Sequence, residues 1–167
     1  EDAGLAPSAI GYVNGHGTAT AQGDVAESLA TSSLFGPRMP ISSQKSFFGH
    51  TLGACGALES WFSIEMMNSD SYVYTLNLDH VDPECGELDY LRGEFRQMSH
   101  QYVMNNNFAF GGANASLVLT RDHEDTRLPV SDRRVVLTGL GAVTSAGETV
   151  SALEEAVAAG EQAFTEV

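Results

Sequence analysis

Short apolar runs and glycine-containing turns alternate along the first part of the chain. The pattern predicts strands at residues 10–13 and 39–43 and helices at residues 24–35 and 53–68. Gly36 and Pro37 follow the first helix directly and are expected to stop it. The second helix is so apolar that we expect it to be buried rather than to lie at the surface.

Strand signals dominate the next part of the chain. Extended segments are expected at residues 72–78, 88–91, 102–105 and 117–120. The second of these falls in the acidic stretch 79–94, which we expect at the surface, and is predicted to be an edge strand. The last two flank Gly111 and Gly112, which predicts a hairpin.

The pattern changes after residue 121. Residues 122–132 are polar and predict a linker. A β-branched strand that ends in a glycine turn is expected at residues 134–147. Thr149 is then in position to cap a helix that closes at Gly160.

The turn after the first predicted strand places a histidine, His16, between Gly15 and Gly17. Glycine on both sides of an imidazole has little use in packing, because no bulky neighbour shields the ring. The hydroxyls of Thr18 and Thr20 can bind a polar, uncharged ligand. This turn is therefore predicted to be part of a site.

A cation and an imidazole, Lys45 and His50, lie five residues apart before a run of glycine and alanine. Small residues allow another helix or a ligand to approach the backbone closely. Taken alone, the segment fits equally well a packing helix preceded by a histidine without function.

Three segments taken together resemble a known family. They are N-G-H-G-T-A-T-x-x-G-D from residue 14, K-S-x-x-G-H-x-x-G-A-x-G-A-x-E from residue 45, and N-F-A-F-G-G-A-N-A-S-L from residue 107. Their order and spacing resemble the carboxy-terminal half of a β-ketoacyl-acyl-carrier-protein synthase, a condensing enzyme of the thiolase-like superfamily. The resemblance covers about residues 3–121.

The resemblance implies an α/β thiolase-like layered fold, a mixed β-sheet flanked by helices, that is incomplete in this chain. Residues 1–121 are expected to be the carboxy-terminal half of a ketosynthase domain, and 122–132 the linker. Residues 133–167 resemble the start of an amino-terminal half. The order of the two parts allows three explanations: a slice across tandem domains, a permuted or split chain, or a chance match of a common strand–turn–helix unit.

The resemblance also implies catalytic roles. His16 and His50 match the family's two histidines, whose Nε2–H groups are expected to point at the same thioester oxygen. Lys45, Asp24 and Glu27 are implied to form a charged network that fixes His16. Because isolated buried charges are costly, these three groups are expected to be paired.

Further positions match the family's motifs. Glu59 closes the second motif and is assigned to the supporting network. Phe110 matches a gating phenylalanine whose backbone N–H contributes to the oxyanion hole. Thr18 and Thr20 match contacts to the phosphopantetheine arm of the substrate.

The reaction that the resemblance implies is decarboxylative Claisen condensation of acyl and malonyl thioesters, in fatty-acid or polyketide biosynthesis. It needs a nucleophilic cysteine, which the family places in a small-residue elbow of the amino-terminal half, and this chain has no such segment. Cys55 lies in the Gly/Ala run and is expected to be a buried, inert thiol, and Cys85 a surface residue. The nucleophile is therefore expected from outside the chain, and the isolated chain is expected to be inactive.

Two alternatives belong to other functional classes. The chain would be a non-catalytic ketosynthase-like partner of the chain-length-factor type, or a structural junction fragment without activity. Such partners generally lack the histidines, and this chain has both, so the catalytic interpretation is favoured.

The net charge of −14 argues against nucleic acid and anionic membranes as partners. The partners implied by the resemblance are an acyl carrier protein and the missing ketosynthase half or a second ketosynthase domain, in a homodimer or heterodimer. Because carrier proteins are usually acidic, most cationic contacts to a carrier are expected to come from surface outside this chain.

Composition gives a compartment and excludes several kinds of site. Two cysteines in 167 residues indicate a reducing environment, for which the cytoplasm is the plain inference. No apolar run approaches the roughly 20 residues of a membrane helix. No dinucleotide fingerprint, P-loop or H-E-x-x-H motif occurs, and neither a metal nor a cofactor is expected beyond the phosphopantetheine that carries the substrate.

Overall fold

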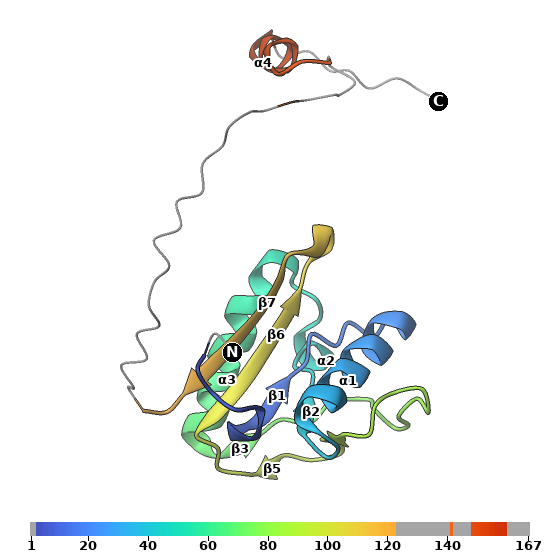
Figure 1. Ribbon diagram of the computed structural model, residues 1–167, viewed down its shortest axis with the longest axis vertical. Helices are drawn as coiled ribbons and strands as arrows, with labels where there is room; N and C mark the ends of the chain where they lie inside the picture. Colours follow the sequence, from blue (N-terminus) through green and yellow to red (C-terminus); the bar gives the residue numbers. More distant parts are fainter. Residues whose placement is uncertain (1–2, 123–140, 142–147, 160–167) are drawn as a thin grey trace. The chain divides into compact units, whose positions relative to one another are not determined.

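The computed structural model describes residues 3–122, 141 and 148–159, and the chain divides into two units, Glu1–Leu128 and Pro129–Val167, which are described separately (Figure 1). The α-helices are α1 (Ala21–Phe35), α2 (Lys45–Phe48), α3 (Cys55–Ser69) and α4 (Val150–Ala159). The strands are β1 (Ile10–Asn14), β2 (Pro40–Ser42), β3 (Ser71–Tyr72), β4 (Asp89–Tyr90), β5 (Arg96–Gln97), β6 (Tyr102–Phe108) and β7 (Asn114–Thr120). Short 3₁₀ turns occupy Pro7–Ala9, Leu52–Ala54 and Phe110–Gly112.

The first unit is built on a five-stranded sheet with the order β4-β2-β1-β6-β7. Four of these strands run parallel, and β7 returns antiparallel to β6. β3 and β5 form a separate antiparallel pair. The fold is the expected mixed sheet flanked by helices, with α3 running behind the β6–β7 hairpin (Figure 1).

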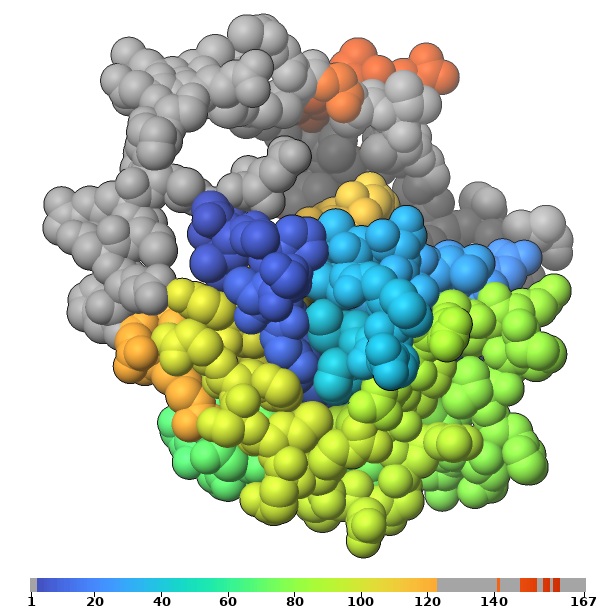
Figure 2. Space-filling model, turned by 60° about the horizontal axis from the view of Figure 1, so that its bottom comes forward, coloured from blue at the N-terminus to red at the C-terminus, as the bar shows by residue number. Residues whose placement is uncertain are grey.

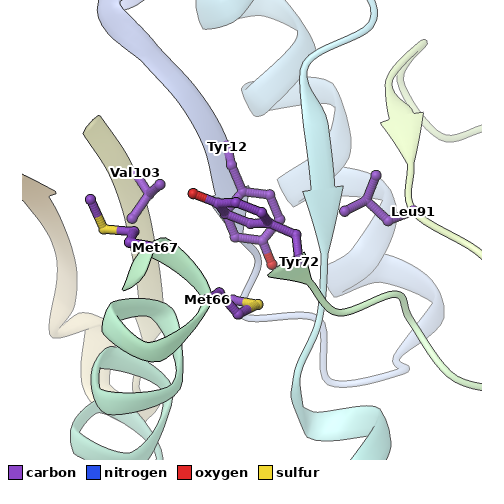
Figure 3. Close-up of a cluster of buried hydrophobic side chains, with 6 residues drawn as sticks. All are labelled: Tyr12, Met66, Met67, Tyr72, Leu91 and Val103. Atoms are coloured by element: carbon purple, nitrogen blue, oxygen red, sulfur yellow. The ribbon is translucent and has the colours of Figure 1, made fainter. Parts of the chain in front are cut away.

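Apolar side chains cover both faces of the central strand β1, as is usual for parallel sheets. On one face Tyr12 packs with residues of α3, β3 and β6, and this cluster consists of Tyr12, Met66, Met67, Tyr72, Leu91 and Val103 (Figure 3). On the other face the cluster consists of Ile10, Val13, Met39 and Ile41, and Phe35 of α1 packs against it. β1 is thereby fixed on both sides, and the turn that follows it starts from a rigid base.

Several predicted elements are confirmed. β6 and β7 form the predicted hairpin, each longer than expected, and β4 is the predicted edge strand. The first helix begins at Ala21 rather than at residue 24, because Thr20 already has the extended backbone of an N-cap. In the expected extended segment 72–78, only Tyr72 belongs to a strand.

The second predicted helix, α3, is expected to be buried, but only one of its faces is. α3 buries a stripe that includes Glu59, Ser63 and Met66, whereas Trp61 is 55% and Ile64 43% exposed. Both faces of α3 carry apolar residues, so sequence periodicity could not show which face packs on the sheet.

The second unit is described only at α4 and a few residues before it. Thr149 Oγ1 accepts a hydrogen bond from the Ala152 N–H at 3.1 Å, so the predicted cap is confirmed. The predicted strand 134–147 lies outside the described residues except for Gly141, and so does most of the linker 122–132. No helix in the part of the chain that the structure describes has the length and apolar character needed to cross a bilayer.

Candidate active site

His16 lies in a turn at the carboxyl end of β1. The residue after it, Gly17, has a backbone conformation and a close neighbour that leave room only for glycine. Gly17 has φ +40°, and a Cβ there would lie 2.6 Å from the Cβ of Ser43. The Glu27 carboxylate accepts hydrogen bonds from the backbone N–H groups of His16 (2.8 Å) and Gly17 (2.9 Å). α1 therefore holds the main chain of this turn through one side chain.

His50 follows the end of α2, where Gly49 takes a positive φ of 80°. Its Nδ1 accepts a hydrogen bond from the Leu52 N–H at 3.1 Å, and Leu52 itself has a left-handed backbone with φ 51°. Because Nδ1 is the acceptor, the proton of the neutral ring is on Nε2. His50 is thus prepared to donate from Nε2.

The two imidazoles meet edge to face, with ring centroids 5.4 Å apart and planes at 90°. Burial, the Lys45 cation and His50 together lower the pKa of His16 to about 4, so His16 is neutral near pH 7. Its Nδ1 is buried and has no hydrogen-bond partner among the described residues. The structure thus brings together the two histidines that the sequence predicted.

The Lys45 ammonium is paired with the Glu59 carboxylate, and both side chains are almost fully buried. Of the three acids assigned to the supporting network, Glu59 pairs with Lys45, whereas the predicted pairing of Lys45 with Asp24 and Glu27 is wrong. Glu59 lies one helix further along the chain, in α3, and occupies the place beside the cation.

The carboxyls of α1 bind backbone instead. Burial raises the pKa of Glu27, although the N–H groups of Gly17 and His16 offset part of the effect. Burial also raises the pKa of Asp24, which is offset in part by backbone hydrogen bonds from the turn that contains Thr18 and Thr20. Both acids shape the turns around the site, and neither meets the cation.

A cavity of about 780 Å³ opens beside His50. The residues that line it include Thr18, Thr20, Asp24, Glu27, Lys45 and His50. Its other wall is the segment after β3, and Figure 2 shows this green segment lying along the light-blue and cyan segments of α1 and β2. The Thr18 and Thr20 hydroxyls, 3.3 Å apart, give this cavity a polar edge.

Phe110 is not brought to the histidines: it is 96% exposed in the turn between β6 and β7. Phe108, at the end of β6, instead places its ring 5.6 Å from the His16 ring. Sequence analysis missed Phe108, because both phenylalanines flank Ala109 and nothing in the pattern shows which one turns inward.

Neither cysteine of the chain is fully exposed. Cys55 is buried, as predicted, and its thiol donates a hydrogen bond to Asn107 Oδ1 at 3.1 Å. Cys85 is half-buried in the cavity wall rather than being a plain surface residue, and His80 lines the same cavity. Within residues 3–122, 141 and 148–159, no group of three or more His, Cys, Asp or Glu side chains could hold a metal ion.

Comparisons with known proteins show which proteins this chain is similar to. Residues 1–79 match the family model "Beta-ketoacyl synthase, C-terminal domain". The chain is 42% identical over 123 residues to 3-oxoacyl-[acyl-carrier-protein] synthase 2 of Coxiella burnetii, an alignment that covers 72% of this chain and 30% of that protein. Residues 1–79 thus match the carboxy-terminal domain of a β-ketoacyl synthase, and the chain is similar to β-ketoacyl synthases over about 70% of its length.

Solved structures of this family share the fold. A β-ketoacyl synthase from Burkholderia phymatum is 63% identical with a TM-score of 0.69, covering 71% of this chain and 29% of its own. A ketosynthase in complex with its chain length factor from Xenorhabdus doucetiae is 35% identical with a TM-score of 0.65, covering 70% and 30%. The chain thus spans less than a third of the length of these β-ketoacyl synthases.

Proposed function

We propose that this chain supplies the two-histidine half of a β-ketoacyl-acyl-carrier-protein synthase active site, which carries out decarboxylative Claisen condensation in fatty-acid or polyketide biosynthesis. The observation that carries the proposal is the edge-to-face pair of His16 and His50, with His16 neutral and His50 donating from Nε2. The nucleophilic cysteine is proposed to come from outside this chain. Cys55 is not a candidate because its thiol is buried and donates a hydrogen bond to Asn107.

The reaction sets the requirement for the two rings. An acyl group on the external cysteine forms a thioester, and a malonyl thioester loses carbon dioxide as its C–C bond breaks. The electron pair left behind forms an enolate, which attacks the acyl carbonyl and expels the cysteine thiolate. The negative charge that develops on the malonyl thioester oxygen is stabilised by N–H donors that are already in place.

A neutral imidazole suits this role because it can donate without exchanging a proton with the enolate. The lowered pKa of His16 keeps its ring neutral near pH 7. Lys45 lines the cavity but is paired with the buried Glu59 carboxylate, and the proposed reaction does not require its ammonium to reach the substrate.

The substrates are proposed to be thioesters carried on the phosphopantetheine of an acyl carrier protein, without a further cofactor. The polar edge formed by Thr18 and Thr20 suits the amides of that arm. The name of the Coxiella burnetii relative includes the carrier protein, which supports this partner.

The alternative is a non-catalytic partner subunit of the chain-length-factor type, because the chain is also similar to a ketosynthase solved together with its chain length factor. The contact of His50 with His16 and the tautomer of His50 disfavour it, since a subunit without chemistry has no need for two imidazoles brought together.

The domain organisation is also a proposal. Residues 122–132 would link this half to residues 133–167, the start of a second ketosynthase half, in a homodimer or heterodimer located in the cytoplasm. The gene sequence downstream tests it: a D-T-A-C-type elbow would indicate a catalytic second domain, and Gln in place of its cysteine a chain-length partner.

The test of the activity uses the chain joined to an amino-terminal half that carries the nucleophile. His50→Ala is expected to abolish malonyl decarboxylation. The control is His100→Gln: His100 precedes β6 and its ring packs against Tyr72, so this variant should leave the rate unchanged. An undiminished rate in His50→Ala would reject the assigned function.

A further inference from the structure

Two asparagines lie side by side under the candidate site. Asn14 ends β1 and Asn105 lies in β6, and the two are register partners in the parallel pair. Their exposed fractions are 0% and 1%. The Nδ2 of Asn14 donates to Oδ1 of Asn105 at 2.7 Å, so the two amides form one buried unit.

This amide pair is connected to both helices that carry the buried charges. Asn14 Oδ1 accepts a hydrogen bond from the N–H of Gln44, directly before Lys45, at 3.3 Å. Asn14 Nδ2 also donates to Glu59 Oε2 at 3.3 Å. On the other side, Asn105 Nδ2 donates to Ser60 Oγ at 2.9 Å, next to Glu59 in α3.

We propose that the Asn14–Asn105 amide pair is a positioning element that holds Glu59 of α3 against Lys45 of α2 and so fixes the place of the Lys45 cation relative to the His16 ring. Its meaning for catalysis rests on the proposed function. The two asparagines are positioning residues and do not touch the substrate.

The chemistry of asparagine explains the choice of residue. Asn14 must accept a hydrogen bond from the start of α2 and donate to a carboxylate at the same time, which an amide can do and an ionised aspartate cannot. Without these donors, one oxygen of the fully buried Glu59 loses its partner, at a cost in desolvation. The carboxylate would then be free to turn, and Lys45 would follow its counter-ion.

The position of the cation matters because of its effect on His16. Burial has the largest effect on the pKa of His16. Of the two neighbouring groups that also lower it, Lys45 has the stronger influence and His50 the weaker. Glu27 faces the same turn but binds its main chain. A displaced cation would therefore leave His16 easier to protonate.

The test is a titration of the His16 imidazole by NMR in the full chain. In the wild type its midpoint is expected at about 4. Asn14→Leu, which removes every amide contact and keeps the number and branching of the side-chain heavy atoms, is expected to raise the midpoint by about one pH unit. The matched control is Ser63→Ala, which removes the buried contact of α3 with Gln44 and leaves Glu59 untouched, and its midpoint should equal that of the wild type.

Two further variants make the result decisive. The double variant Lys45→Met/Glu59→Gln removes both charges and gives the midpoint of His16 without the cation. The proposal is overturned if the double variant raises the midpoint and Asn14→Leu does not, and equally if the double variant leaves it unchanged. Should Asn14→Leu fail to fold, Asn105→Ala removes the support of Asn14 from the other side, and its midpoint decides in the same way.

This experiment is independent of condensing activity. It needs no nucleophile, carrier protein or second half. If Asn14→Leu shifts the His16 midpoint but His50→Ala still decarboxylates, the proposed function is rejected and this inference stands. If Asn14→Leu leaves the midpoint unchanged but His50→Ala abolishes decarboxylation, only this inference is rejected.

Discussion

At the carboxyl ends of β1 and β2, His16 meets the His50 ring at 5.4 Å, and at the opposite end of the sheet His100 meets the Tyr72 ring at the same centroid distance. Both His16 and His100 have a lowered pKa, and in both cases burial is the main cause. A lowered pKa alone therefore does not distinguish a site from a packed side chain.

The surroundings make the difference. The His100 ring lies directly on Gly11, where a Cβ would come within 2.1 Å of its Nδ1, so this imidazole fills space that the glycine leaves open. The His16 ring meets a second imidazole and the Phe108 ring, and the two glycines on either side of it in the chain, Gly15 and Gly17, line the cavity that also contains His50. The comparison teaches that convergence of groups, rather than the state of one histidine, marks the chemistry.

The largest expected effect on stability comes from comparing two ion pairs, Lys45–Glu59 near the two histidines and Arg121–Asp70 near His100. Glu59→Leu leaves the buried Lys45 without a counter-ion and should lower the free energy of unfolding by about 3–5 kcal/mol in urea denaturation. Asp70→Asn, which removes the half-exposed partner of Arg121, should cost only about 0–1 kcal/mol. Lys45→Met/Glu59→Leu should recover most of the loss, and equal losses in Glu59→Leu and Asp70→Asn would contradict the distinction.

The next effect concerns the two glycines. Gly17→Ala combines a left-handed backbone with a contact of 2.6 Å to Ser43 and should cost about 2–4 kcal/mol. Gly11→Ala only overpacks the His100 ring and should cost about 1–3 kcal/mol. NMR should show the His16 resonances displaced in Gly17→Ala and the His100 resonances in Gly11→Ala; the opposite pattern would refute this assignment of roles.

The pH dependence of stability should separate His16 from its surroundings. Because its pKa falls from 6.5 to about 4 on folding, the unfolded chain binds the proton more readily, and stability is lost as the pH falls from 6.5 to about 4. His16→Gln should lose less stability over that range in urea denaturation. Glu27 and Asp24 have raised pKa values, so they add stability as the pH falls. They do so in the wild type and in His16→Gln alike, and the difference between the two proteins therefore reports His16.

The smallest effect is expected at the opposite end. His100→Gln should also flatten the acid loss of stability, but by less than His16→Gln, because Asp70 offsets part of the influence of burial and Arg121 on the pKa of His100. The same denaturation series measures it. A larger change in His100→Gln than in His16→Gln would reverse the comparison.

Sequence was sufficient for the parts of the fold that local signals specify. The hairpin of β6 and β7 followed from two strand patterns around Gly111 and Gly112, and the Thr149 cap from one hydroxyl before a helix. His16 and His50 are paired through the resemblance of their motifs to a known family, and the structure shows that these motifs follow β1 and β2, which are neighbouring parallel strands.

Other features depend on contacts between distant segments. Nothing local indicates that Lys45 takes Glu59 rather than Glu27, since the choice is made when α3 packs against the sheet. The Asn14–Asn105 pair depends on the register of strands 91 residues apart. Phe108 and Phe110 differ only in how the turn orients them.

The left-handed backbone of Leu52 has a consequence for the exposed ring of His50. A leucine in this conformation costs about 1–2 kcal/mol, and its N–H is thereby aimed at the imidazole. Solvent would otherwise let the ring exchange its proton between the two nitrogens. The main chain thus decides, at a modest energetic cost, which nitrogen of His50 carries the hydrogen before any ligand binds.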